Sequence, residues 1–145
     1  MTTSSEIDTV MKEATKWAQE DLSVVGLALV GSHATGTARS DSDIDLVVIA
    51  SNPKKRFLVN RDWINRFGTK IGVEEIEKWG LLTSVRVCYE NNMEIEFGFT
   101  TSEWTRIPAD IGTARVVTDG IKILYDPEDK LSILIDHCHS EKPST

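Results

Sequence analysis

Apolar residues recur at helical spacing near the start of the chain and then gather into short continuous runs. Over residues 5–22 one helix face is apolar and the other carries Lys, Glu and Gln, which predicts an amphipathic helix. Two runs of strand length follow, Val24–Val30 and Ile44–Ala50, and turn-forming residues end both. Because the first run does not alternate with polar residues, it is typical of a strand buried on both faces of a sheet. The second run is interpreted as a further apolar strand.

The second half of the chain alternates between apolar and polar positions. This pattern covers Leu82–Tyr89 and residues 93–99, with turn-forming residues 90–92 between them, so we predict a β-hairpin. One face of the first hairpin strand would be apolar and the other polar. The apolar face holds Val85, Val87 and Tyr89, and the polar face holds Ser84, Arg86 and Cys88.

Shorter elements complete the expected order. Residues 36–42 predict a loop or a single helical turn, residues 60–67 a short helix that ends at Gly68, and residues 121–125 a last strand. Strands and helices in this order predict the α+β class, a mixed β-sheet flanked by helices.

Capping residues mark three further helix starts. Ser102 or Asp110 is expected to cap a short helix, and Asp126-Pro127 to open a final helix that runs to about His139. The apolar face of that final helix completes the core or packs on a neighbouring molecule, and we favour the core. This face consists of Leu131, Leu134 and Ile135.

Composition limits the class of protein. The chain has 145 residues, the size of one domain (1–145), and 40% of them are hydrophobic, enough for a sizeable core. The formal net charge of -7 argues against a general nucleic-acid binder, and the basic run Lys54-Lys55-Arg56 is interpreted as a solvated loop. Two cysteines, no secretory signal and no apolar run of membrane-spanning length predict a soluble cytoplasmic protein without a disulfide framework.

Candidate chemistry is concentrated where the second buried strand begins. Asp43 and Asp45 are two residues apart, so both carboxylates project from one strand face while Ile44 points to the core. Two carboxylates this close repel each other unless a cation lies between them, and Mg²⁺ is the natural occupant. Gly31-Ser32, at the end of the preceding strand, offers backbone N–H groups and a hydroxyl that can cradle a phosphate.

The sequence from Gly31 to Val48 resembles the signature of the nucleotidyltransferase superfamily typified by DNA polymerase β and kanamycin nucleotidyltransferase, in particular its minimal members. That signature is Gly-Ser, a short helix, then Asp-x-Asp on the next strand. Many members carry Arg or another large residue where this chain has Thr35, and Arg39 is the alternative phosphate contact.

The resemblance also implies a third carboxylate on a later strand, usually Asp and sometimes Glu. The hairpin offers Glu94 and Glu96 on one strand face. We favour Glu96, because Ile95 and Phe97 flank it in the more apolar stretch. Glu94 lies nearer the turn and is either the base that takes the acceptor's proton or a solvent-facing residue.

The implied reaction is transfer of a nucleoside monophosphate from an NTP, with ATP favoured, to an acceptor hydroxyl, with two Mg²⁺ ions (or Mn²⁺) held by Asp43, Asp45 and Glu96. The alternative is an antitoxin or regulatory module of the same fold that binds NTP or metal with little or no turnover. A lone domain of this kind supplies half a cleft, so the resemblance also implies a homodimer or a helical partner protein.

Other chemistry-bearing residues are interpreted as structural. The run His137-Cys138-His139 has no partner cluster, and His33 more often faces solvent than phosphate. Trp79 or Trp104 is a candidate for stacking on a base, although core packing is the default for both. Arg86 either faces the same groove as the glutamates or pairs with them.

Overall fold

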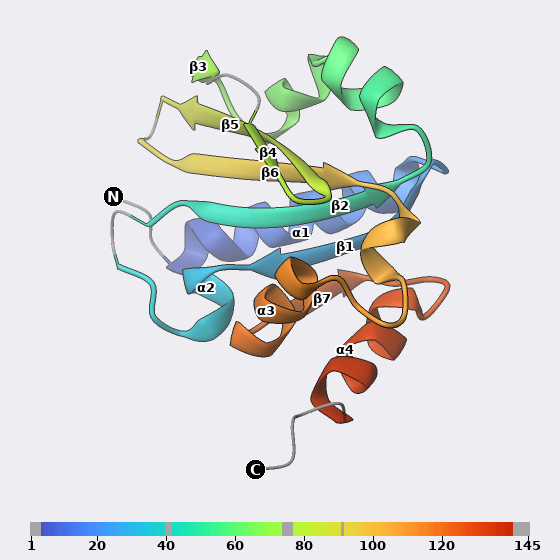
Figure 1. Ribbon diagram of the computed structural model, residues 1–145. Coiled ribbons are helices and arrows are strands. Elements are labelled where there is room, and N and C mark those ends of the chain that lie inside the picture. The colour runs from blue at the N-terminus through green and yellow to red at the C-terminus, as the bar shows by residue number, and fades with distance from the viewer. Residues whose placement is uncertain (1–3, 40–41, 74–76, 91, 141–145) are drawn as a thin grey trace.

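The computed structural model describes residues 4–39, 42–73, 77–90 and 92–140. It contains helices, short helical turns and strands that alternate along the chain (Figure 1). Their order is α1 (Ser4–Glu20), β1 (Val24–Val30), α2 (Ser32–Thr35), β2 (Ile44–Ala50), η1 (Lys54–Val59), η2 (Asp62–Phe67), β3 (Lys70–Val73), β4 (Glu77–Trp79), β5 (Leu82–Tyr89), β6 (Glu94–Thr100), η3 (Ser102–Thr105), α3 (Ile111–Asp119), β7 (Lys122–Tyr125) and α4 (Lys130–Ser140).

These strands form one seven-stranded sheet. The order across it is β3-β5-β6-β2-β1-β7, and β4 pairs with β5. Only β2 and β6 run parallel among the described pairs; β1–β2, β1–β7, β5–β6, β3–β5 and β4–β5 are antiparallel. The sheet is therefore mixed and the fold is α+β, as the sequence predicts.

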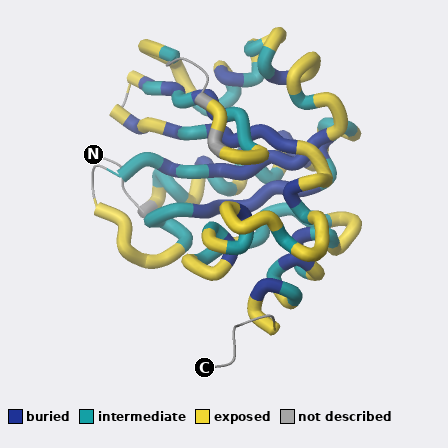
Figure 2. The backbone as a smooth tube through the Cα atoms, in the orientation of Figure 1, coloured by how far each residue is buried: buried dark blue, intermediate teal, exposed yellow. Residues whose placement is uncertain are grey.

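The two faces of the sheet are covered by different helices. Figure 1 shows α1 behind the sheet and α3 in front of it, and the central strands are the most deeply buried part of the chain (Figure 2). Alternate residues of β2 serve the two faces: Leu46 and Val48 pack on the α1 side, whereas Val47 and Ile49 pack with α3 and α4. β1 has the buried pattern that the sequence predicts, and β2, predicted as a second apolar strand, has the same pattern.

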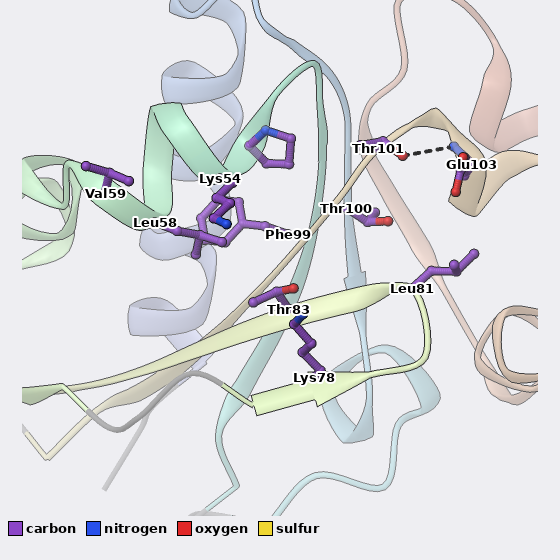
Figure 3. A pocket seen from close by; sticks show the side chains of 11 residues that line it. Lys54, Leu58, Val59, Lys78, Leu81, Thr83, Phe99, Thr100, Thr101 and Glu103 are labelled. Atoms are coloured by element: carbon purple, nitrogen blue, oxygen red, sulfur yellow. Dashed lines mark hydrogen bonds between the residues drawn. The ribbon is translucent and has the colours of Figure 1, made fainter.

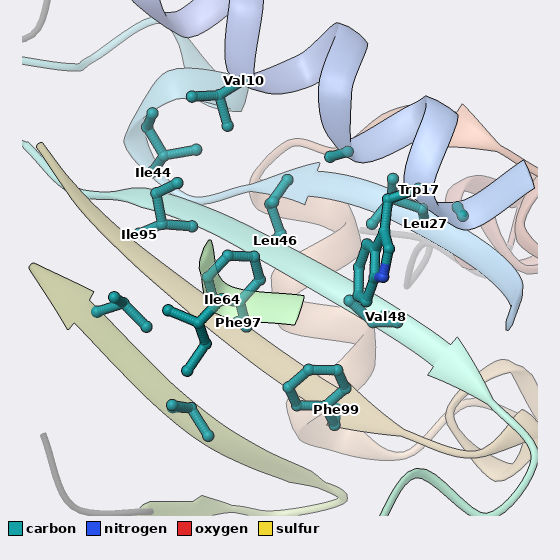
Figure 4. Close-up of a cluster of buried hydrophobic side chains, with 14 of the residues drawn as sticks. Val10, Trp17, Leu27, Ile44, Leu46, Val48, Ile64, Ile95, Phe97 and Phe99 are labelled. Atoms are coloured by element: carbon teal, nitrogen blue, oxygen red, sulfur yellow. The ribbon is translucent and has the colours of Figure 1, made fainter. Parts of the chain in front are cut away.

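The core on the α1 side is rich in aromatic rings (Figure 4). Trp63 packs edge-on against Phe97 at a centroid distance of 4.7 Å, and Phe57 stacks on Phe99 at 5.2 Å. Trp17 from α1 lies 5.7 Å from Trp63. Such rings bury large areas and gain further from edge-to-face contact, so they anchor η1, η2 and α1 to β6.

The predicted hairpin is confirmed. β5 and β6 are antiparallel, and the apolar face of β5 (Val85, Val87 and Tyr89) is buried. The final helix α4 also buries Leu131 and Leu134, so its apolar face completes the core on the α3 side.

Several predictions for the connecting segments were wrong. Lys54-Lys55-Arg56 is exposed to solvent, as predicted, but it forms the first half of a turn of π-helix in place of a loop, because Phe57 behind it is buried and holds the segment on the core. The final helix begins at Lys130 rather than at Pro127. The Asp126 carboxylate accepts hydrogen bonds from the amides of Leu131 and Ser132, 3.0 and 2.9 Å away, which fixes the first turn there.

The two candidate caps also differ from each other. Asp110 caps α3, accepting hydrogen bonds from the amides of Gly112 and Thr113, as predicted. Ser102 is the first residue of η3, and Thr101 is its cap. No described helix is both long and apolar enough to cross a membrane.

Candidate active site

The site begins at the junction between β1 and the following turn. Val30 at the end of β1 pairs with Asp45 near the start of β2, so Gly31 lies beside the Asp45 side chain. Gly31 has φ +72°, and a Cβ there would overlap Oδ2 of Asp45 and lie 3.1 Å from its Cγ. Glycine is required on both counts, because a side chain would be strained and would displace the carboxylate.

A single helical turn, α2, follows at once. The amides of Ala34 and Thr35 both donate to the Gly31 carbonyl at 3.0 Å, and Gly36 ends the turn with φ +81°. By helix geometry, the amides of Ser32 and His33 then stand at the open N-terminal end of the turn. The short helix that the resemblance implies is thus present at residues 32–35. The described residues between Gly36 and Ser42 form a loop, which is one of the two alternatives predicted for that segment.

Three strands bring charged side chains into one row. Asp45 on β2 is the direct partner of Glu96 on β6, and Glu96 is the direct partner of Arg86 on β5. Directly opposed residues point to the same face of a sheet, which here is the face covered by α3 and α4. Sequence patterns predicted each strand but not this register.

Arg86 contacts two carboxylates. Its Nη2 donates to Oε1 of Glu96 at 3.1 Å, and its Nε lies 3.4 Å from Oδ2 of Asp43. All three side chains are partly buried, with 24–35% of each exposed. Arg86 therefore faces the groove and also pairs with a glutamate; the two alternatives from the sequence hold together.

Asp45 is the most electrostatically perturbed group of the cluster. Burial, the negative charges of Asp43 and Glu96 and a hydrogen bond with Glu96 raise the pKa of Asp45 to about 7, although Arg86 opposes the shift. The single positive charge of Arg86 therefore does not fully offset the negative charges of Asp43, Asp45 and Glu96.

A cleft of about 790 Å³ opens over this row. Its walls come from the end of β1, from α2, from β2, β5 and β6, and from the end of α3. The lining residues are Val30, Gly31, Ser32, Thr35, Thr37, Asp45, Leu82, Ser84, Arg86, Glu96, Val116 and Asp119. One cleft thus contains four of the predicted residues, Gly31, Ser32, Asp45 and Glu96. Asp43 is not among its described lining residues but contacts Arg86, which is.

The carboxylates fit a divalent cation by their chemistry. Hard oxygen donors and surplus negative charge are what Mg²⁺ and Mn²⁺ require. As the described side chains stand, no three Asp, Glu, His or Cys residues are grouped to hold a metal ion. Asp43 and Glu96 contact Arg86 instead.

Some candidates lie outside the cleft. Glu94 is exposed at the start of β6 and accepts from Sγ of Cys88 at 3.6 Å. Arg39 is an exposed loop residue whose amide donates to Oγ of Ser42, and it is not among the described lining residues. His33 Nε2 lies 3.3 Å from the Ser42 carbonyl, so this side chain fastens the loop to the turn.

Trp104 packs in the core, as the default interpretation predicts, and is not available for stacking on a base. Its side chain is 2% exposed and packs in the core with α4. The side chain of Trp79 lies outside the described residues. Cys138 of the His-Cys-His run is buried in the same core as Trp104, in line with the structural interpretation of that run.

Sequence reasoning missed part of the cleft wall. Ser84 belongs to the polar face of β5, so the alternation that placed Arg86 could have identified it. Val116 and Asp119 line the cleft because α3 packs over the sheet. The residues around them contain no motif that predicts this packing.

A second hollow of about 420 Å³ lies between η1, β4 and the ends of β5 and β6 (Figure 3). Leu58, Leu81 and Phe99 supply apolar walls, and Lys54 and Lys78 supply its positive charges. Among its described lining residues only Glu103 is acidic, so this hollow lacks the paired carboxylates of the first.

Comparison with known proteins adds three findings. A family model described as a nucleotidyltransferase domain matches residues 10–110, more than half of the chain. An aminoglycoside 6-adenyltransferase from Bacillus subtilis aligns with 16% identity and a TM-score of 0.48, covering 63% of this chain and 33% of that one. A CCA-adding enzyme in an apo form aligns with 15% identity and a TM-score of 0.45, covering 93% of this chain and 33% of that one.

The chain spans about a third of the length of both of these structures. No curated protein sequence matches it.

Proposed function

The chain belongs to the nucleotidyltransferase domain family, and we propose that it transfers a nucleoside monophosphate from an NTP to an acceptor hydroxyl in a metal-dependent reaction. The observation that carries the proposal is the direct pairing of Asp45 with Glu96 on adjacent strands, beside Gly31, on the wall of a cleft large enough for a nucleotide. ATP is the proposed donor.

In this proposal Gly31 and Ser32 bind the triphosphate. The Ser32 hydroxyl and the amides at the open end of the α2 turn donate hydrogen bonds to phosphate oxygens. Thr35 and Thr37, whose hydroxyls lie 2.7 Å apart, line the same wall. Arg39, outside the described lining, is proposed to reach the phosphates only if its loop moves toward the cleft.

Asp43, Asp45 and Glu96 would hold two Mg²⁺ or Mn²⁺ ions. Such ions, when bound, neutralise phosphate charge and lower the pKa of the attacking hydroxyl. The reaction itself is an exchange at the α-phosphorus. The hydroxyl oxygen forms a bond to that phosphorus, the bond to the bridging oxygen of the β-phosphate breaks, and pyrophosphate leaves.

Glu96 is our choice for the carboxylate that takes the hydroxyl proton. It lines the cleft beside Asp45, whereas Glu94 does not line it. A base must lie within hydrogen-bond reach of the proton that it removes, and this favours Glu96 over Glu94.

The acceptor side is proposed to come from a second copy of the chain or from a helical partner protein. The described lining residues account for triphosphate binding and for the row of carboxylates. The apolar face of the last helix α4 is packed in the core and is not available to bind an acceptor. Light scattering of the purified chain tests this: a strict monomer that transfers nucleotide to a small acceptor would contradict it.

The function is tested with two labels in parallel. ATP labelled at the α-phosphate and ATP labelled at the γ-phosphate are incubated with the protein, Mg²⁺ or Mn²⁺ and a cell extract. Nucleotidyl transfer puts the α-label on the acceptor and the γ-label in pyrophosphate. Binding of ATP without either product would favour the antitoxin or regulatory module, and γ-label on the acceptor would indicate a kinase.

A further inference from the structure

Arg86 lies in the middle of a group of acidic side chains. Its guanidinium lies between two carboxylates, 3.1 Å from Glu96 on β6 and 3.4 Å from Asp43, the residue before β2. Asp45 is the next residue along the same row. The positive charge thus lies among the carboxylates to which the proposed function assigns divalent ions.

Arg86 is also the only positively charged side chain among the described residues that line the cleft. Three carboxylates on neighbouring strands repel one another, and a partly buried cation relieves that repulsion most effectively from the middle of the group. A bound divalent ion would relieve it in the same way. The two cations therefore compete for the same oxygens.

We propose that Arg86 is a tethered counter-ion: it neutralises Asp43 and Glu96 in the metal-free protein, gives up these carboxylates when a divalent ion binds, and so sets the metal affinity of the site. This inference rests on the proposed function for the identity of the metal ligands. Arg86 acts here through the carboxylates and is a positioning residue.

The proposal fixes the sign of a mutational effect. If Arg86 competes with the metal, its removal strengthens metal binding, since the ion no longer has to displace a guanidinium or approach a like charge. If Arg86 only supports the carboxylates in the geometry that the metal needs, its removal weakens binding. Lysine keeps the charge, so a charge-based competition is largely preserved in Arg86→Lys.

The test is the affinity for Mn²⁺ without nucleotide, measured by calorimetry and by the loss of the free-ion signal in electron paramagnetic resonance. We expect Arg86→Gln to bind Mn²⁺ at least about tenfold more tightly than the wild type, and Arg86→Lys to stay within about threefold. Arg66→Gln is the matched control, because Arg66 also bridges two carboxylates, Glu13 and Glu20, outside the cleft. It should leave the affinity unchanged.

A second readout uses the unaltered protein, in case Arg86→Gln does not fold. The ¹⁵N resonance of the Arg86 Nε should shift on titration with Mg²⁺, while that of Arg66 stays fixed. Mn²⁺ affinity that is equal or weaker in folded Arg86→Gln would overturn the proposal, and so would an Arg86 resonance unmoved at saturating Mg²⁺.

These failures are distinguishable from failure of the proposed function. A wild type that binds Mn²⁺ and transfers nucleotide, with no gain in Arg86→Gln, defeats only the counter-ion role. If neither protein binds Mn²⁺ at millimolar concentration while the wild type transfers nucleotide, only the counter-ion role is wrong, because the nucleotide's phosphates then supply the missing ligands. If the wild type also transfers no nucleotide in Mg²⁺ or Mn²⁺, the proposed function is wrong as well.

Discussion

Gly31 lies so close to Asp45 that a Cβ on Gly31 would overlap the carboxylate oxygen Oδ2. The contact follows from the register, in which Val30 and Asp45 are direct partners. The glycine that follows β1 and the aspartate near the start of β2 are therefore structurally coupled. The glycine leaves the space in which the carboxylate sits.

The first prediction concerns this contact. Gly31→Ala should reduce nucleotide transfer at least about 100-fold, because the new methyl group must push Asp45 out of its place and misplacement of this size costs that much. It should also destabilise the fold by about 1–2 kcal/mol, since φ +72° is unfavourable for alanine.

Gly36→Ala is the control for backbone strain. Gly36 also has a positive φ, +81°, but a Cβ there meets no atom within 4 Å. Thermal unfolding should show at least as much destabilisation in Gly31→Ala as in Gly36→Ala, because only the former also displaces a side chain. Transfer assays should show a loss of activity in Gly31→Ala alone. Equal activity in both variants would mean that Gly31 does not hold the space for Asp45.

The second prediction is a pH dependence of stability in EDTA. The pKa of Asp45 is about 7 in the folded protein, mainly because of burial and then because of Asp43 and Glu96, so the folded state binds a proton that the unfolded state releases near pH 4. The free energy of unfolding should therefore fall as the pH rises from about 4 to about 7. Each unit of pKa shift corresponds to about 1.4 kcal/mol.

Asp45→Asn isolates this effect, because asparagine does not titrate. Urea unfolding between pH 5 and pH 8 should show the variant gaining stability over the wild type as the pH rises. In Asp21→Asn the difference from wild type should stay constant over this range. Despite burial, hydrogen bonds from Ser23 and Arg56 lower the pKa of Asp21, so its contribution changes only at lower pH. A flat difference for Asp45→Asn would contradict the raised pKa.

The third prediction concerns Ser32. Ser32→Ala should weaken the binding of Mg²⁺–ATP about 10- to 150-fold, the loss expected for one hydrogen bond to a charged group of about 1.5–3 kcal/mol. Calorimetry measures it, with Ser102→Ala as the control outside the cleft. Binding by the wild type should also disappear in EDTA; equally tight ATP binding without metal would be inconsistent with a metal-bridged site.

The fourth prediction tests the aromatic core. Phe97 is fully buried and contacts Trp63, Phe67 and Phe99. Phe97→Ala should cost about 3–5 kcal/mol of stability, the range for emptying a buried aromatic site. Urea unfolding checks it. A cost below about 1 kcal/mol would indicate that the cluster does not anchor the helices to β6.

The sequence predicts those parts of the fold in which burial produces a regular pattern of apolar residues along the chain. β1 is a continuous apolar run, and β2 is apolar from Leu46 to Ala50, because both of their faces are covered there. The β5–β6 hairpin alternates because half of β5 faces the cleft. The edge strands β3 and β4 are short, and the described residues of β3 are mostly exposed, so they carry no such period.

The sequence predicts which residues belong to the site, but it does not predict how the strands place them relative to one another. Asp43 and Asp45 are two residues apart in the sequence, and Gly31 reaches Asp45 through the antiparallel pairing of β1 with β2. Glu96 joins them through a parallel pairing between distant strands, and Arg86 through the next register along. Neither register is encoded locally, which is why the sequence left Glu94 and Glu96, and both roles of Arg86, as open alternatives.

The most direct test of the central claim is the rate of α-label transfer from ATP by the wild type, by Asp45→Asn and by Asp62→Asn, a control at an exposed aspartate outside the cleft. We predict that wild type and Asp62→Asn transfer the label at equal rates in Mg²⁺ and not in EDTA. We also predict that folded Asp45→Asn transfers none. Transfer at the wild-type rate by Asp45→Asn would contradict the assignment of this row of carboxylates as the catalytic centre.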